Sequence, residues 1–135
     1  VLVSLNSARA KGRDAKRVAE LSQIARAIAL AYTGSAVTFV GCAAQNTRAT
    51  SCTTPSGLGS FLDPSGATSA CTTTAPGSTW CDYSVAEDNG GAGTPTTADW
   101  RVMTYLESGS GTLSAGRVCI SSATSTPYSQ AQGCQ

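Results

Sequence analysis

The side chains of this sequence that could act as nucleophiles are hydroxyls and thiols. Serine and threonine are abundant, but the chain contains no histidine that could serve as their general base. A serine–lysine pair would need a lysine among the hydroxyl-rich residues, whereas both lysines, Lys11 and Lys16, lie near the N-terminus. The sequence therefore predicts no catalytic site, and we expect a protein that is not an enzyme.

The cysteines are the second reactive group, at positions Cys42, Cys52, Cys71, Cys81, Cys119 and Cys134. Zinc sites usually draw ligands from short sequence motifs, and no two of these cysteines are spaced as C-x-x-C. In a small domain, cysteines separated by long gaps indicate disulfides and an oxidising compartment. Six cysteines allow many connectivities, so the sequence alone leaves their pairing open.

Acidic side chains gather around one glycine-rich stretch. Oxygen atoms of Glu87, Asp88, Asn89 and Asp99 could in principle bind calcium. Their spacing matches no calcium-loop motif, so we favour a solvated hairpin tip. The sequence thus predicts no metal and no cofactor, with calcium as the alternative.

The net charge of +1 conceals an uneven distribution. The first 30 residues carry a net charge of +4, and the remaining residues carry −3. Arg9, Arg13 and Arg17 fall on one side of a helix and could contact phosphates, but no aromatic residues alternate with them. A nucleic acid partner is therefore unsupported, and we expect this basic side to be solvated or to face another subunit.

Residues 4–32 predict one long helix, because they contain no proline, one glycine and mostly good helix formers. The helix should stop near Gly34. An apolar stripe that should pack on the rest of the chain comprises Val18, Leu21, Ala25, Ile28 and Tyr32. A nearly opposite stripe of small residues, which would let another backbone approach, comprises Ala8, Gly12, Ala15 and Ala19. The alternative is a single amphipathic helix with an alanine-rich solvent face.

Three segments alternate as strands do: residues 79–87, 100–107 and 116–121. Short connections between them predict an antiparallel meander, which the apolar stripe of the helix would cover. The expected fold is α+β, with three or four strands. Trp80, Trp100 and Tyr128 could form an adhesive surface, but we expect the tryptophans to be buried in the sheet.

Residues 34–78 are rich in serine, threonine and glycine, a composition typical of disorder. Three cysteines and the turn signal Asp63–Pro64 indicate order instead. Leu58, Phe61 and Leu62 could form one apolar patch on a short helical turn before it.

The stretch VLVSLNSARAKGRDAKRVAELSQI, residues 1–24, resembles the middle of the N-terminal helix of type IV pilins and type II secretion pseudopilins. In that family an apolar, membrane-spanning half-helix precedes a short Asn/Ser/Ala passage and a charged, amphipathic half. Val1, Leu2, Val3 and Leu5 look like the end of the apolar half. The resemblance implies an N-terminal helix (1–33) and a head (34–135), the head comprising an αβ-loop (34–78), a sheet (79–121) and a loop like the D-region (119–134).

The resemblance also implies a structural role, as the subunit of a type IV pilus-like surface filament that serves adhesion, twitching motility or DNA uptake. Alternatives are a major pseudopilin of a secretion system or a secreted, disulfide-rich adhesin. The expected partners are other copies of the chain and the assembly machinery. An apolar segment upstream of Val1 would anchor the subunit in the inner membrane before assembly, since the chain contains no run of 18 apolar residues.

Residue roles follow from the same resemblance. Helix contacts in the filament core are expected from Val1, Leu2, Leu5, Ala8, Gly12, Ala15 and Ala19. Charge contacts between subunits are expected from Arg9, Arg13 and Arg17. A disulfide between Cys119 and Cys134 would close the D-region-like loop, and the favoured pairing of the other cysteines is local, 42–52 and 71–81.

Overall fold

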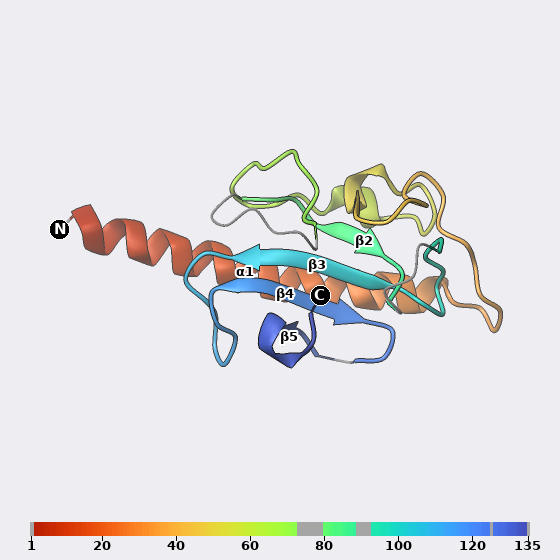
Figure 1. The fold of residues 1–135 in the computed structure, drawn as a ribbon. Coiled ribbons are helices and arrows are strands. Elements are labelled where there is room, and N and C mark those ends of the chain that lie inside the picture. Colours follow the sequence, from red (N-terminus) through yellow and green to blue (C-terminus); the bar gives the residue numbers. More distant parts are fainter. Residues whose placement is uncertain (1, 73–79, 89–92, 125, 135) are drawn as a thin grey trace.

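The computed structural model describes residues 2–72, 80–88, 93–124 and 126–134. A single helix packs on an antiparallel sheet of five strands in the order β1-β2-β3-β4-β5 (Figure 1). The elements are α1 (Leu2–Ala31), β1 (Thr47–Arg48), β2 (Ser84–Ala86), β3 (Arg101–Leu106), β4 (Gly116–Ser121) and β5 (Tyr128–Ser129), with short 3₁₀ turns η1 (Ala49–Ser51), η2 (Leu58–Ser60) and η3 (Gln130–Gln132). The α+β class and the meander are confirmed.

The helix α1 has 30 residues and is therefore about 45 Å long. It ends after Ala31, and Gly34 adopts a left-handed conformation with φ of 92°. Figure 1 shows its N-terminal part extending beyond the sheet, and residues 3–9 are exposed. The predicted helix is thus confirmed to within two residues at its N-terminal end and one at its C-terminal end.

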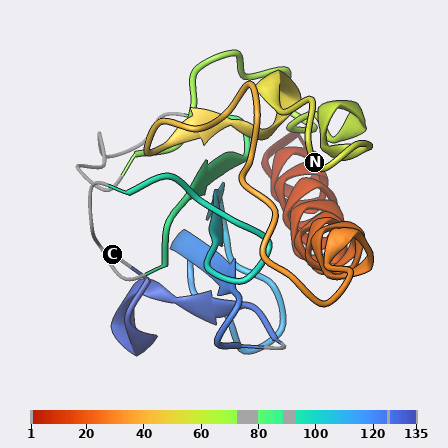
Figure 2. The ribbon, with the colours of Figure 1, turned by 90° about the vertical axis from the view of Figure 1, so that its right-hand side faces the viewer.

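The apolar stripe of α1 covers one face of the sheet, and Figure 2 looks nearly along the helix with the strands beside it. Leu21, Ile24 and Ile28 are completely buried, and Val18 and Ala25 pack against the same core. The sheet side of this core comprises Tyr83, Val85, Trp100, Val102, Leu106, Val118 and Ile120. The assignment of Tyr32 to this interface was wrong: its side chain is 46 % exposed, because it follows the last helical residue and leaves the track of the stripe.

Two of the three expected strands are confirmed, but the expected number of three or four strands is wrong, because the sheet has five. β3 and β4 fall within residues 100–107 and 116–121, in antiparallel register from Arg101↔Ser121 to Leu106↔Gly116. β2 is shorter than the predicted 79–87, because the backbone around Asp82 bonds to Ser69 and Cys71 instead. Residue 79 lies outside the described residues. Two-residue strands β1 and β5 extend the sheet to five strands rather than three or four.

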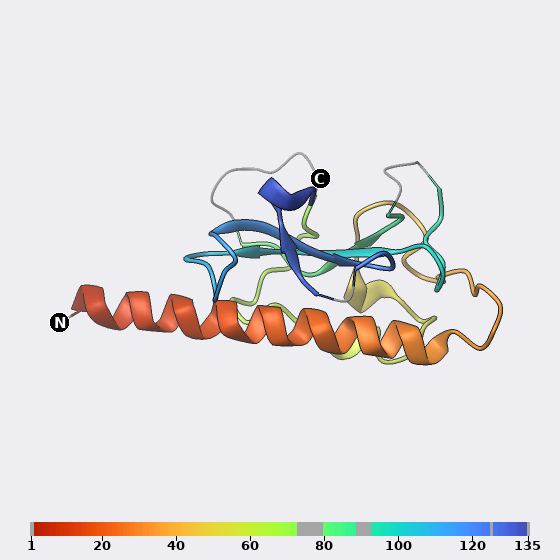
Figure 3. The same cartoon turned by 90° about the horizontal axis from the view of Figure 1, so that it is seen from below.

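Two of the three cystines help to bury the outer face of the sheet, the face turned away from α1. The structure contains the expected disulfides 42–52, 71–81 and 119–134, of which 42–52 belongs to the core beneath α1. Cys71, Cys119 and Cys134 form a second buried cluster with Met103. Figure 3 shows η3 on the side of the sheet opposite α1. Both faces of the central strands are therefore covered.

The segment between α1 and β2 is ordered over residues 34–72, so the disordered alternative is wrong for that part. Backbone hydrogen bonds join Val40 to Thr54 and Ala49 to Tyr83. Leu58 is completely buried and Phe61 packs against the core, as expected. Leu62 is 56 % exposed and does not join them, because the next residue, Asp63, turns into the interface with α1.

One buried hydroxyl in the helix–sheet interface should be replaceable with a gain in stability. Thr104 is completely buried, and its hydroxyl has no hydrogen-bond partner among the described residues. Its strand neighbour across the register is the core residue Val118. Thr104→Val keeps the volume and removes the unsatisfied group, so the free energy of unfolding should rise by about 1 kcal/mol.

Urea denaturation at neutral pH measures this change. The control is Thr112→Val at an exposed position, which should change the free energy of unfolding by less than about 0.5 kcal/mol. A loss of stability in Thr104→Val alone would mean that the hydroxyl is satisfied in solution.

Candidate functional site: the outward face of the helix and the ion pairs that hold it

The outward face of α1 can serve as an assembly surface only if the helix is held firmly, and a buried arginine holds it. Arg17 is completely buried. Its guanidinium donates to Asp63 from Nε (2.7 Å) and Nη2 (3.1 Å), while Nη1 donates to Asp14 (2.9 Å) and Glu107 (2.7 Å). These carboxylates come from the helix, the αβ-loop and the end of β3. One side chain thus joins three segments of the chain.

Arg13 extends this cluster towards the surface. Its Nε and Nη2 donate to the two carboxylate oxygens of Glu107 at 2.6 and 2.5 Å. The ring centroid of Trp80 lies 5.9 Å from the guanidinium carbon of Arg13 and equally far from that of Arg17. This distance is in the range of cation–π contacts. Trp80 therefore covers the ion pairs where they approach solvent.

Asp14 fixes the helix to the turn that follows β3. Its buried carboxylate accepts the backbone N–H groups of Glu107 (2.9 Å), Ser108 (2.7 Å) and Gly109 (3.0 Å). Gly109 has φ of 92°, and a Cβ there would lie 2.5 Å from the carbonyl oxygen of Leu113. Only glycine fits this turn, which aims three consecutive amides at one carboxylate.

Further polar contacts continue the cluster into the αβ-loop and β2. The backbone N–H of Asp63 donates to Asp82 Oδ1 (3.0 Å), and Arg48 pairs with Asp82 Oδ2 at 2.7 Å. Nearer the middle of α1, the hydroxyl of buried Tyr83 donates to Glu20 (2.5 Å). The helix is thereby linked to the sheet and the loop over several turns.

The ionisation of these groups reflects their partners. Hydrogen bonds from Arg13 lower the pKa of Glu107 below its ordinary value, despite burial. Burial alone would raise the pKa of Asp63, but hydrogen bonds from Arg17 and Ser65 outweigh it and the pKa falls. Burial also opposes the charge of Arg17, yet its carboxylate partners raise its pKa above the ordinary value. All of these groups are therefore charged at neutral pH.

The structure corrects the role expected for one of the arginines. Arg17 was expected to contact neighbouring subunits, but it is buried and bound to carboxylates of its own chain. Arg13 pairs with Glu107 of its own chain while its side chain stays 32 % exposed, so its contact with a neighbouring subunit stays a prediction. Arg9, the third, is exposed on the projecting part of α1, and its role stays a prediction. The helical periodicity could have predicted that Arg17 is buried, because Arg17 lies one turn before Leu21 on the buried face of the helix.

The small residues lie together on the opposite, outward side of the helix. Ala8, Gly12, Ala15 and Ala19 are all exposed, and a Cβ added at Gly12 would meet nothing within 4 Å. Leu5 is 49 % exposed. Val1 lies outside the described residues, and the side chain of Leu2 is not described. Ala8, Gly12, Ala15 and Ala19 form the outward stripe. Contacts of this stripe with other subunits stay a prediction, as do the contacts expected of Val1, Leu2 and Leu5.

Large apolar side chains are exposed at both ends of the helix. Val3 and Leu30 are each 83 % exposed, at the projecting end and near the C-terminal end of α1. Trp80 is 47 % exposed, which corrects the expectation that both tryptophans are buried, whereas Trp100 is buried. Tyr128 is half-buried. The exposure of Trp80 follows from its position over two guanidinium groups rather than within the sheet.

The acidic residues considered for calcium are engaged in turn contacts. The backbone N–H of Asp88 donates to Asp99 Oδ1 at 3.0 Å, and Glu87 accepts the N–H of Gly93 at 3.1 Å. Asn89 lies outside the described residues. Within the described part of the chain, no three acidic, cysteine or histidine side chains are grouped so that they could hold a metal ion. The expected absence of a bound metal stays a prediction.

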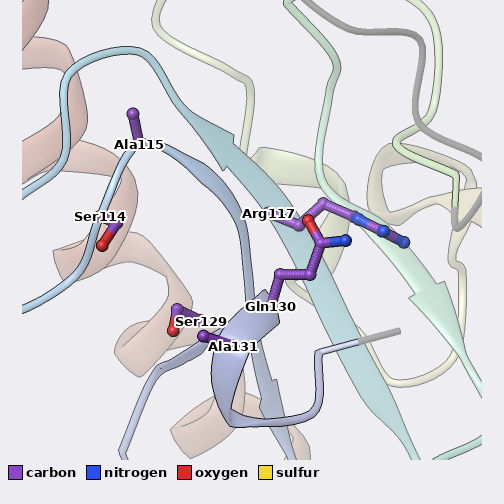
Figure 4. Close-up of a pocket in the computed structure, with 6 residues that line it drawn as sticks. All are labelled: Ser114, Ala115, Arg117, Ser129, Gln130 and Ala131. Carbon is purple, nitrogen blue, oxygen red and sulfur yellow. The ribbon is translucent and has the colours of Figure 1, made fainter.

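A hollow of about 390 Å³ lies between the start of β4 and η3 (Figure 4). Its lining comprises Ser114, Ala115, Arg117, Ser129, Gln130 and Ala131. Figure 4 shows Gln130 extending towards Arg117, away from the two serine hydroxyls. Because this lining contains no carboxylate, thiol or lysine, the hollow offers no general base to those hydroxyls.

Comparison with known proteins identifies no relative. No family model matches the chain, and neither a curated protein nor a solved structure matches it. Among the described residues, the helix is not apolar enough over a sufficient length to cross a membrane.

The burial of Arg17 predicts a large loss of stability when its charge is removed. Arg17→Met leaves Asp14 and Asp63 buried without their cation, so the free energy of unfolding should fall by about 3–5 kcal/mol. The matched control is Arg9→Met, at an exposed arginine of the same helix, which should change it by less than about 0.5 kcal/mol. Equal urea midpoints for the two variants would contradict the structural role of Arg17.

The lowered pKa values of Asp63 and Glu107 predict acid lability. Their ordinary values are 3.8 and 4.5, and the folded protein holds both pKa values lower. The resulting stabilisation is complete above pH about 5 and is lost as the pH falls through the folded pKa values. Denaturation curves between pH 7 and pH 2 should show this loss, with a shallower pH dependence in Glu107→Gln. An unchanged dependence in that variant would contradict the assignment to Glu107.

Proposed function

We propose that this chain is a structural subunit of a type IV pilus-like surface filament, assembled from copies of itself. The observation that carries the proposal is the division of α1 into two faces. One face is bound to the sheet through Arg17 and the apolar stripe, and the other presents the outward stripe to solvent. The helix also projects beyond the sheet, where its apolar residues have no sheet to cover them (Figure 1).

Physical arguments favour helix–helix association at this face. A projecting helical end lacks the tertiary contacts that stabilise most helices in water, so neighbouring copies would support it. Small side chains let two helices approach closely and gain dispersion contacts along their length. Alanine and glycine contribute little area each, so many subunits and an apolar segment upstream would have to share the assembly energy.

The arrangement of the remaining chain fits the same proposal. A helix on an antiparallel meander and a C-terminal loop closed by the disulfide 119–134 are the features that the resemblance to pilins implies. That disulfide favours a pilin over a major pseudopilin, since many pseudopilins lack it. We place the filament at the cell surface and the subunit in the inner membrane before assembly, where assembly machinery would take it up.

A wedge on the outward stripe should prevent filament formation without unfolding the subunit. Ala15→Trp places a large side chain where close helix approach is proposed, and Ala15 is exposed in the subunit. In producing cells we expect at least a tenfold loss of sheared surface filaments, counted by electron microscopy, because many interfaces in each filament carry the wedge. The purified variant should unfold at the wild-type temperature.

Ala131→Trp is the matched control, since Ala131 is an exposed alanine on η3, on the other side of the sheet (Figure 3). Its filament count should equal that of the wild type. Normal filaments in Ala15→Trp would show that the outward stripe is not an assembly surface. Filaments that lack this chain by immunogold labelling would contradict the proposal as a whole.

A further inference from the structure

The outer face of the sheet contains a buried cation without a counter-ion among the described residues. Arg101, in β3, is only 6 % exposed, and its Nε has no hydrogen-bond partner. No ion pair joins it to any carboxylate in the described parts of the chain. Arg48, on the same side of the sheet, is paired with Asp82, so that carboxylate already has its cation. Unlike Arg48, Arg101 therefore has no carboxylate partner among the described residues.

Two buried hydroxyls accompany Arg101 on this face. Ser121 is its direct neighbour on β4, and Ser84 is its diagonal neighbour on β2, two residues from Ala86. Ser84 is 1 % exposed and its hydroxyl has no partner in the described residues. The hydroxyl oxygen of Ser121 accepts the N–H of Ala123, which leaves its own proton to donate. The three side chains thus combine one positive charge with unused donors.

Water does not supply everything that this arrangement lacks. A water molecule can accept a hydrogen bond from the buried Nε or from a hydroxyl, but it does not bring the negative charge that an oxyanion would place beside a guanidinium whose residue is only 6 % exposed. A guanidinium presents its donors as a planar fork that matches two oxygens of one oxyanion. Serine hydroxyls can donate to the remaining oxygens.

We propose that Arg101, Ser84 and Ser121 form a binding site for one small oxyanion of the phosphate, sulfate or carboxylate type. The slight exposure of Arg101 restricts entry to a free ion and excludes a bulky acidic partner. The site lies on the opposite side of the sheet from α1 and does not depend on the proposed filament role. Bound anion would stabilise the sheet where β2, β3 and β4 meet.

Titration of the full chain with inorganic phosphate and with sulfate tests the site. At constant ionic strength maintained with sodium chloride, both should raise the unfolding temperature of the wild type with a saturating dependence on concentration. In ¹H–¹⁵N spectra, the amides of residues 84, 101 and 121 should shift together and give one Kd. Acetate added in the same way tests whether a carboxylate suffices.

The variant Arg101→Gln keeps a side chain of similar reach without the charge, and it should lose the phosphate-dependent stabilisation. Arg9→Gln removes the same charge from an exposed position and should retain it. Equal stabilisation of both variants would place the anion elsewhere, and an equal effect of chloride would mean screening; either result overturns the proposal.

A second variant applies if Arg101→Gln does not fold. The double substitution Ser84→Ala and Ser121→Ala keeps the cation but removes both hydroxyl donors, so the Kd for phosphate should rise about tenfold. An unchanged Kd, or no phosphate binding by the wild type, would overturn the proposed site. Filament assembly enters none of these measurements, so this proposal and the filament proposal can fail separately.

Discussion

A buried guanidinium is costly unless its charge is compensated, and the way this protein compensates Arg17 decides how the long helix lies on the rest of the chain. Arg17 obtains its carboxylates from α1, from the αβ-loop and from the end of β3, so the cluster forms only when all three segments are in place. The core alone would specify their positions weakly, because the chain contains only two phenylalanines and two tryptophans. Charge pairing and three disulfides supply the specificity that large apolar side chains supply in other domains.

This anchoring has a consequence for the opposite side of the helix. Because one face is fixed by Arg17, Asp14 and the apolar stripe, the outward stripe has a fixed orientation relative to the sheet. A helix held in this way can present small residues to a neighbour without first being ordered, which reduces the entropy cost of association. The ion pairs thus fix one face of α1, and the outward stripe on its other face is the surface that we propose for assembly.

Local patterns in the sequence predicted the elements that are decided locally. Helix propensity predicted α1, and alternation predicted β3 and β4. The disulfide 119–134 was expected from the resemblance to pilins, and 42–52 and 71–81 from a preference for local pairing. The sequence did not predict the strands that depend on pairing with residues far away in the chain. β1 and β5 have two residues each, and they form only because β2 and β4 lie beside them. The candidate site was predicted in part. The small residues do share an exposed face, but Arg13 and Arg17 were interpreted as surface charges, since their partner Glu107 lies at least 90 positions away.

Arg17 in the helix interface and Arg101 on the outer sheet face, two of the three arginines that are buried among the described residues, differ in one informative respect. Arg17 is matched by three carboxylates within its own chain, so its charge is a structural device that needs nothing else. Arg101 is 6 % exposed, has no ion pair among the described residues, and shares its face of the sheet with the hydroxyls of Ser84 and Ser121. Burying a charge is costly unless it is compensated, and at Arg101 we propose that a bound oxyanion supplies the compensation. A fold that neutralises one buried cation fully and leaves another beside unused donors supports a ligand at the second, and the proposed oxyanion site follows from that contrast.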